Sequence, residues 1–311
     1  MQSADFTGVI IMLTKNTGSR IAGYGHRDII TAYLFILPAV LIIGIFVIFP
    51  SIKLLANSFQ SVSIMGGAGG FVGLENFKAV FKSHDVANSF QATLKFMVTV
   101  VIVQTSLALF LALQVNKSVS GIGFFKTVYF FPVVVSFVVI SFLWRFAYSR
   151  DFGPINAFLD FVGLARQGFL SDPDQALWCV IATSIWKSWA FFMIIFLIGL
   201  KEIPKELYES AAIDGATRFQ EFIYITFPML KRTTLFIVVI TTMDSVVKVF
   251  VPVFTMTGGG PRGKTNVLIH YIWQQAFRLG DVSFASAVAV VMFIFIFIMG
   301  IIQFKLGGKK E

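Results

Sequence analysis

Charged residues are scarce in this chain. Asp, Glu, Lys and Arg make up only 13% of its 311 residues, whereas 57% are hydrophobic. Soluble domains carry roughly a quarter charged residues, so this composition excludes an ordinary water-soluble globule and favours several membrane spans. The formal net charge of +9 does not indicate a nucleic-acid partner, because the basic residues are scattered between apolar runs and form no basic stripe.

Cysteine and histidine are also rare. The one cysteine, Cys179, lies in an apolar run and has no second thiol in the chain with which to form a disulfide. The three histidines, His26, His84 and His270, lie far apart on segments expected to be loops, without the spacing of a metal site. Since neither paired catalytic carboxylates nor a nucleophile elbow stands out, we expect no metal site and no catalysis by this chain itself.

Apolar runs long enough to cross a bilayer dominate the rest of the chain. They cover Ile29 to Ile52, Phe96 to Asn116, Thr127 to Trp144, Ala176 to Ile198, Thr233 to Met256 and Val282 to Phe304. We therefore expect an all-α membrane protein with six transmembrane helices and both termini on one side. Residues 1–28, with Met12 as an alternative start, and residues 305–311 would form tails. Lys and Arg are slightly more frequent on that side, which agrees with a cytoplasmic location.

The longest charged interruption lies between the fourth and fifth runs. Pro204 suits a first helical position and Gly215 suits the position just past a helix end, so the residues between them are expected to form a short surface helix. Thr217 and Gln220 have the spacing of a capping box for a second short helix. An Asp-Gly turn separates the two helices.

This interruption resembles the EAA loop of binding-protein-dependent ABC importer permeases. The matching residues are Glu209, Ala211, Ala212, Asp214, Gly215 and Ala216, then Phe222, Ile225 and Pro228, with Ser210 in place of a small alanine. The resemblance implies a coupling helix that seats in a groove of a separate ATPase subunit, where Glu209 would pair with a basic residue. The alternative is an ordinary helix-turn-helix loop between two spans.

Two outer loops extend the resemblance. Residues 73–77 have the sequence Gly-Leu-Glu-Asn-Phe, similar to the family's first outer loop, and residues 257–261 have the sequence Thr-Gly-Gly-Gly-Pro, similar to the loop after its fifth span. The string from Gly258 to Thr265 also satisfies a phosphate-loop pattern. That motif needs a loop between a strand and a helix. A predicted membrane span precedes the string from Gly258 to Thr265, so we expect this string not to bind ATP.

The resemblance implies the type I ABC importer permease fold over residues 29–304, with the family's transmembrane core at about residues 88–304. Within the family, the chain most resembles the sugar-importing branch. This resemblance implies a chain in the cell membrane that forms the path for a carbohydrate. The implied partners are a second permease, two ATPase subunits, a solute-binding protein and membrane lipid. No nucleic acid is implied, and ATP and Mg would bind to the ATPase, leaving no cofactor on this chain. One departure is residues 250–254, Phe-Val-Pro-Val-Phe, where many relatives have Phe-Asp-x-x-Tyr.

Charged residues also interrupt two spans. Lys187 lies near the middle of the fourth between Trp186 and Trp189, and Asp244 and Lys248 lie four residues apart in the fifth, where they can pair. An ionised group at the bilayer centre costs roughly 3 kcal/mol, so these residues should face protein or a wet cavity. They either line a transport path, with the tryptophans against a sugar, or form structural contacts. A rival hypothesis is an ion-coupled secondary transporter that uses Asp244 and Lys248 as a relay.

Overall fold

The structure is a computed structural model that describes residues 26–62, 68–116 and 122–307. The expected N-terminal tail through residue 25, with Met12, part of the glycine cluster near residue 68 and residues 308–311 lie outside the described residues. The chain divides into two compact units, Met1–Ala56 and Asn57–Glu311, and each is described by itself.

The described part of the first unit is one apolar helical stretch. It consists of α2 (His26–Ile43), the wide π-helical turn η1 (Gly44–Ile48) and α3 (Phe49–Asn57). Its mean hydropathy over Ile30–Asn57 is 2.8, and none of the residues in its most apolar window is buried within the protein. Because its apolar side chains all face outward, this helix requires lipid or another protein around it, as expected of the first predicted span.

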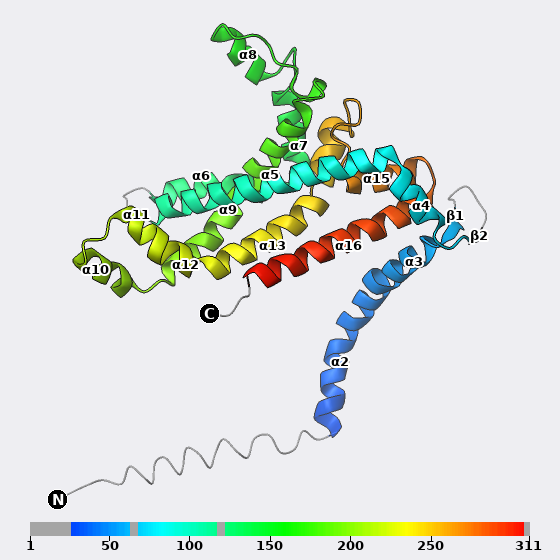
Figure 1. Ribbon diagram of the computed structural model, residues 1–311, viewed down its shortest axis with the longest axis horizontal. Coiled ribbons are helices and arrows are strands. Elements are labelled where there is room, and N and C mark those ends of the chain that lie inside the picture. Colours follow the sequence, from blue (N-terminus) through cyan, green and yellow to red (C-terminus); the bar gives the residue numbers. More distant parts are fainter. Residues whose placement is uncertain (1–25, 63–67, 117–121, 308–311) are drawn as a thin grey trace, which may run out of the picture. The chain divides into compact units, whose positions relative to one another are not determined.

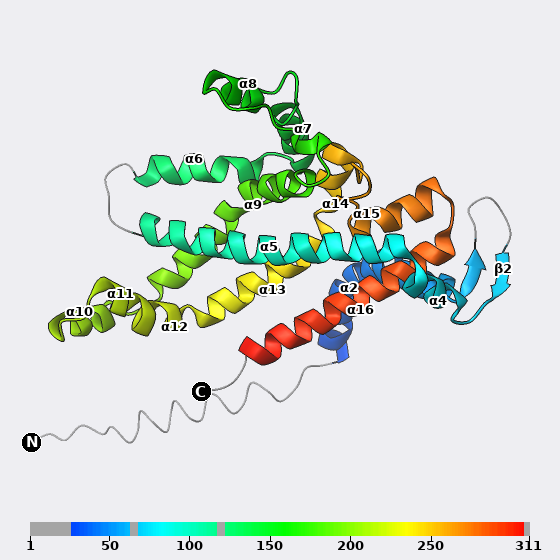
Figure 2. The same cartoon turned by 45° about the horizontal axis from the view of Figure 1, so that its top comes forward.

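Four long helices form the body of the second unit. They are α5 (His84–Val115), α9 (Ala176–Lys201), α13 (Lys231–Val247) and α16 (Val282–Gly307). The four run side by side in Figure 1 and Figure 2. Each is long and apolar enough to cross a membrane, α13 together with the helical turns that follow it to Thr257. They correspond to the second, fourth, fifth and sixth predicted spans.

Shorter elements lie at the ends of these helices. The hairpin of β1 (Gln60–Val62) and β2 (Ala68–Phe71) and the helix α4 (Glu75–Lys82) precede α5 in sequence. The third predicted span contains α6 (Ile122–Val134) and α7 (Phe137–Ala147). The later elements are α8 (Pro154–Phe161), η2 (Phe169–Ser171), α10 (Lys205–Ile213), α11 (Arg218–Glu221), η3 (Phe222–Thr226), α12 (Phe227–Met229), α14 (Phe250–Pro252), η4 (Val253–Thr257), α15 (Leu268–Trp273) and η5 (Gln274–Arg278). Within this unit α10 to α12 lie at one end of the long helices, and α15 lies toward the other end (Figure 2).

The helix α5 is longer than the apolar run that predicted it. It begins at His84 rather than Phe96, because the Ser83 side chain accepts a hydrogen bond from the backbone N–H of Val86 and Asp85 lies in the first turn. At 32 residues it is about 48 Å long, which exceeds the hydrocarbon core of a bilayer. The prediction that His84 lies on a loop was therefore wrong.

The core of the second unit centres on α9. Ala108 and Ala112 of α5 are fully buried and share a core cluster with Phe192 and Phe196 of α9. Small side chains let two helix backbones approach closely in a membrane, where packing rather than the hydrophobic effect holds helices together. This contact fixes α9 between α5 and the third span.

The third span is broken. The sequence predicts one helix from Thr127 to Trp144, but α6 ends at Val134, α7 begins at Phe137, and the two helices meet at an angle of 110°. Pro132 lies in the last turn of α6, where its missing N–H and its ring weaken the helix. The predicted third span is therefore present as a bent pair of helices, and apolarity alone does not encode the bend.

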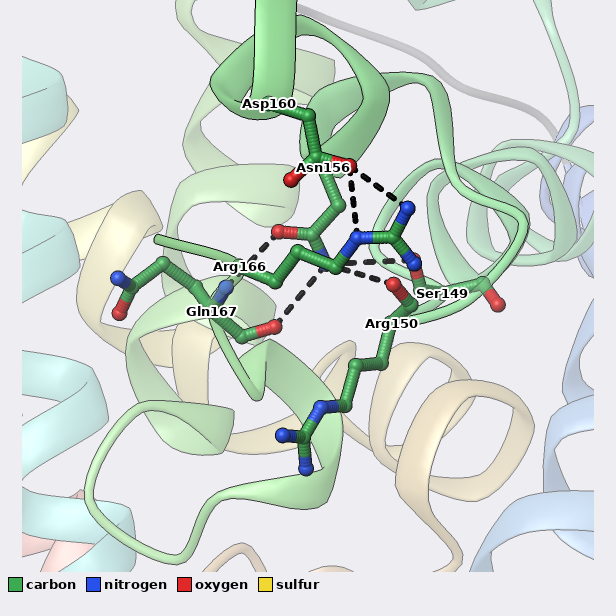
Figure 3. Close-up of polar contacts among 6 residues, drawn as sticks. All are labelled: Ser149, Arg150, Asn156, Asp160, Arg166 and Gln167. Atoms are coloured by element: carbon green, nitrogen blue, oxygen red, sulfur yellow. Dashed lines mark hydrogen bonds and ion pairs between the residues drawn. The ribbon is translucent and has the colours of Figure 1, made fainter. Parts of the chain in front are cut away.

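The segment after α7 folds around one buried amide. Asn156 of α8 is 1% exposed. Its Nδ2 donates to the carbonyl oxygens of Ser149, Arg150 and Gln167 at 3.5, 3.2 and 3.0 Å, and its Oδ1 accepts from the N–H of Gln167 at 2.9 Å (Figure 3). The predicted outer loop over residues 147–175 is therefore an ordered segment, held closed by a side chain that replaces secondary-structure hydrogen bonds.

Replacing Asn156 with Ala should open this segment. The change leaves buried backbone groups without partners, which costs about 1–3 kcal/mol, so residues 149–167 should become sensitive to limited proteolysis and the apparent Tm in detergent should fall. The control is Asp160→Ala, which removes the exposed 2.6 Å pair with Arg166, because such surface pairs contribute about 0–1 kcal/mol. Equal protease resistance of the two variants would contradict the role given to Asn156.

Candidate functional site

The residues that match the EAA loop lie on α10 and the turn after it. Pro204 is the residue before the first helical residue, one position earlier than predicted. Gly215 has a φ of +77°, which confirms the predicted helix end in the left-handed region. A Cβ at Gly215 would meet nothing within 4 Å. The strain of another residue there would therefore lie in the backbone alone.

The second short helix begins as predicted. Thr217 Oγ1 accepts from the N–H of Gln220 at 3.4 Å, and Gln220 Oε1 accepts from the N–H of Thr217 at 2.7 Å. This capping box is confirmed, and it satisfies backbone donors at the start of α11. Together with Gly215 it gives the connection between α10 and α11 a defined geometry.

The predicted coupling residues form an accessible surface. Glu209, Ser210, Ala212, Asp214 and Gly215 are exposed, and Ala211 and Ala216 are half-buried. Beside them Ile213 and Phe219 are 87% and 71% exposed. Large apolar side chains next to small residues, away from the long helices, are typical of a surface that another protein covers.

The opposite side of α10 is tied to the spans. The hydroxyl groups of Tyr208 and Thr226 are 2.9 Å apart and hydrogen-bonded, which joins α10 to η3. Ile203, just before α10, is buried in the same core cluster as Leu200 of α9 and Leu230, which precedes α13. The accessible surface is therefore connected by buried contacts to both α9 and α13.

A cavity of about 350 Å³ with polar and charged groups in its walls lies between the long helices. Its walls come from α5, the break between α6 and α7, α9 and the end of α13. Its uncharged polar lining consists of Gln104, Ser184, Ser188, Thr241 and Ser245, and its charged lining consists of Lys187, Asp244 and Lys248. This size falls in the range of small-molecule pockets. The structure thus brings together all three charged span residues singled out in the sequence.

Lys187 closes the end of the broken helix. Its Nζ donates to the carbonyl oxygen of Val133 at 2.7 Å. Val133 lies in the last turn of α6, where a carbonyl has no helical N–H partner because the helix ends at Val134. A cation at this position also stabilises the negative end of the helix dipole.

Asp244 and Lys248 form the predicted pair. Lys248 Nζ lies 2.6 Å from Asp244 Oδ2, and the two residues are four positions apart in sequence, so this prediction is confirmed. The two side chains are 64% and 34% exposed for Lys248 and Asp244 respectively. The opposite charges of Asp244 and Lys248 therefore neutralise each other on the cavity wall.

The tryptophans do not line this cavity. Trp189 is buried and its ring packs 5.2 Å from that of Tyr129, and the ring of Trp186 packs 5.5 Å from that of Trp144. The aromatic part of the lining comes instead from phenylalanines, among them Phe137 and Phe191. A role for Trp186 and Trp189 in the transport path stays a prediction.

Sequence reasoning missed Thr241 and Gln104. Both lie in apolar spans, are at most 3% exposed and line the cavity. Thr241 Oγ1 is buried without a hydrogen-bond partner among the described residues, which costs about 1–3 kcal/mol unless a ligand or water supplies one. A neutral polar residue in an apolar run gives no sequence signal by which such a position could be found.

The phosphate-loop-like string folds as a closed turn. Thr265 is fully buried, and its hydroxyl bonds to Gly260 O at 2.6 Å and to Thr257 Oγ1 at 2.7 Å. The elements before it are α14 and η4, which are helical. A phosphate loop requires a preceding strand and a Ser or Thr hydroxyl free for Mg²⁺. The geometry therefore differs from that of a nucleotide site.

His270 lies on α15, not on a loop as predicted, and is 1% exposed. Its Nδ1 is 2.7 Å from Asn266 Oδ1, and its ring stacks on Trp273 at 5.9 Å. Burial, with the nearby Arg278 as a smaller cause, lowers the pKa of His270 to about 4. This residue is neutral at pH 7 and belongs to the packing beneath the outer turn.

These features define a mostly helical membrane protein with a cavity between its spans that contains charged groups, and with an accessible helix at one end. A family model described as "binding-protein-dependent transport system inner membrane component" matches residues 104–308. The chain belongs to this family, the permease subunits of ABC importers, and is a multi-pass protein of the cell membrane. The predicted family and location are confirmed.

Curated relatives cover nearly the whole chain. A sn-glycerol-3-phosphate transport system permease protein of Agrobacterium fabrum is 32% identical over 285 residues, which cover 90% of this chain and 96% of the relative. A trehalose/maltose transport system permease protein of Thermococcus litoralis is 29% identical over 286 residues, which cover 92% of this chain and 96% of the relative.

Solved structures share the fold. A chain of a bacterial ABC transporter involved in the import of the acidic polysaccharide alginate matches with a TM-score of 0.82 and 24% identity, and the match covers 91% of this chain and 96% of that one. A second structure, of a bacterial alginate ABC transporter in complex with alginate pentasaccharide-bound periplasmic protein, matches with a TM-score of 0.80. The predicted type I permease fold is confirmed.

Stability should depend on pH through His270. The unfolded chain has the ordinary histidine pKa of about 6.5 and the folded chain one of about 4, so protons bind the unfolded state first as pH falls. The contribution of His270 to the free energy of unfolding is complete above about pH 6.5 and is lost toward pH 4. The free energy of unfolding should therefore fall by about 2 kcal/mol between pH 8 and pH 5. The apparent Tm in detergent should fall accordingly.

The variant His270→Phe should reduce this pH dependence, since it removes the titrating group and keeps a ring in the aromatic packing. His84, which is exposed, provides the control variant His84→Gln, which should keep the slope of the native chain. An unchanged slope in His270→Phe would rule out His270 as its source.

Proposed function

We propose that this chain is a non-catalytic permease subunit that forms one half of the path of an ATP-driven carbohydrate importer. Its partners would be a second homologous permease, two ATPase subunits and an extracytoplasmic solute-binding protein. The observation that carries the proposal is the accessible helix α10 with its left-handed Gly215 end, in a chain of the binding-protein-dependent family.

The coupling part of the proposal rests on the chemistry of α10. Ala212 and Ser210 leave room for close approach of another protein, Ile213 offers an apolar anchor, and Glu209 and Asp214 offer negative charges. An apolar anchor beside small residues is typical of a helix that docks into a groove. A basic residue in the ATPase groove would pair with Glu209.

The carbohydrate part rests on the relatives and on the cavity. The relatives are named as permeases for glycerol phosphate and for trehalose or maltose, and one similar structure is named as an alginate importer. The cavity offers hydroxyl, amide and phenyl groups, which suit the alternating polar edges and apolar faces of a sugar. ATP and Mg²⁺ would bind only in the ATPase subunits, so this chain would hold no cofactor.

Co-purification tests the assembly and separates it from an ion-coupled secondary carrier. A tagged chain expressed with its genomic neighbours should bring down an ATPase and a second permease in mild detergent, and transport in proteoliposomes should require ATP inside. Uphill transport by the purified chain alone, driven by an ion gradient, would instead favour the relay role of Asp244 and Lys248.

Gly215 should be required for coupling. The variant Gly215→Val forces a β-branched residue into a left-handed conformation, at a cost of about 1–2 kcal/mol or more, and should reorient α10 in its groove. We expect ATP hydrolysis to persist while transport per ATP falls several-fold, measured on the reconstituted complex.

The matched control is Gly215→Asn, because Asn tolerates the left-handed region better than other residues. It should retain most of the coupling. If Val at this position gave the native ratio of transport to hydrolysis, the turn would have no part in coupling.

A further inference from the structure

The charges on the cavity wall do not balance. Three charged residues line the cavity, and Asp244 and Lys248 neutralise each other at 2.6 Å. The remaining cation, Lys187, donates a hydrogen bond to a neutral carbonyl, that of Val133. Among the described residues no carboxylate forms an ion pair with Lys187, so the cavity of this chain carries a net charge of about +1.

An unbalanced charge at membrane depth is costly. Lys187 lies in the middle of α9, and the insertion cost of such a group is roughly 3 kcal/mol or more. The end of α6 offsets part of this cost, because a helix C-terminus carries about half a negative charge. A full anion on a bound solute would balance the rest and could use the N–H groups of Lys187 that Val133 leaves free.

A second group in the cavity also lacks a partner. Thr241 Oγ1 is buried without a hydrogen bond among the described residues, and Thr241 lines the same cavity as Lys187. A solute hydroxyl would satisfy it. The phenyl rings of Phe137 and Phe191 line the cavity as well and can cover the apolar face of a sugar ring.

We propose that the cavity takes an acidic carbohydrate, a sugar acid or a sugar phosphate, whose anionic group pairs with Lys187 and whose hydroxyl groups reach Thr241. Lys187 is then the residue that selects for charge. This inference rests on the proposed function, since it assumes that the cavity is part of the path of a carbohydrate importer. The competing source of a counter-charge is a carboxylate of the second permease, in which case neutral sugars would bind as well as acidic ones.

Direct binding to the assembled transporter in detergent tests the proposal without the solute-binding protein. The probes are glucuronate, glucose 6-phosphate and glucose, which share a ring and differ in charge, with Kd measured from the ligand-dependent shift of Tm. Both acidic probes should bind about tenfold or more tightly than glucose, because a hydrogen-bonded charge pair of this kind contributes enough for one order of magnitude. Tighter binding than glucose by only one of the acidic probes would still support the proposal, and it would identify the anionic group of the solute as a carboxylate or as a phosphate.

Lys187→Met should abolish the preference for the acidic probes by raising their Kd about tenfold toward that of glucose. Lys187→Arg keeps the charge and should keep the preference. The control is Lys201→Met, the same change at the exposed end of α9, which should leave every Kd unchanged. Because Lys187→Met also removes the hydrogen bond to Val133 at the end of α6, Asp244→Asn serves as an independent variant: it frees Lys248 and should tighten the binding of both acidic probes.

The outcomes separate this inference from the proposed function. Equal binding of glucose and the acidic probes, or a preference that survives Lys187→Met and does not respond to Asp244→Asn, would overturn the inference and leave a carbohydrate importer standing. No shift with any of the three probes, in a complex that retains its ATPase, would count against both this inference and a carbohydrate cargo.

Discussion

The hydrogen bond between Lys187 and the carbonyl of Val133 is the interaction on which the cavity depends. Inside a membrane every backbone polar group needs a partner, so a broken helix is stable only where something satisfies its free carbonyls. Lys187 does this at 2.7 Å from a helix 54 residues further along the chain. The 110° bend between α6 and α7 lies beside α9, and the break between the two helices forms one wall of the cavity.

The same helices connect the cavity to the accessible surface of α10. Lys187 lies on α9, which leads into α10, and Thr241 lies on α13, which follows the second short helix. The hydrogen bond between Tyr208 and Thr226 joins the two sides of that connection. Under the proposed function, a partner that moves α10 would therefore act on both walls of the cavity. Packed helices transmit such a displacement because protein interiors have low compressibility.

Local features were predictable from the sequence. The long spans, the capping box of Thr217 and Gln220, the left-handed Gly215 and the pair of Asp244 with Lys248 each depend on residues within a few positions of one another or on a long apolar run. The start of α5 was misplaced because the turns from His84 onward are polar and give no span signal. The burial of His270 was missed for a related reason, since one polar residue among loop-like neighbours does not reveal the aromatic side chains that cover it.

The sequence by itself determined the class of protein, most of the membrane spans and the shape of the turn at Gly215, because hydropathy and backbone preference act along the chain. Only the tertiary structure decided that the third span is broken, that Lys187 meets Val133 and that Thr241 is left without a partner. These outcomes depend on which helices lie side by side. That choice is made by packing between residues far apart in sequence, such as Ala108 against the phenylalanines of α9, and no local pattern records it.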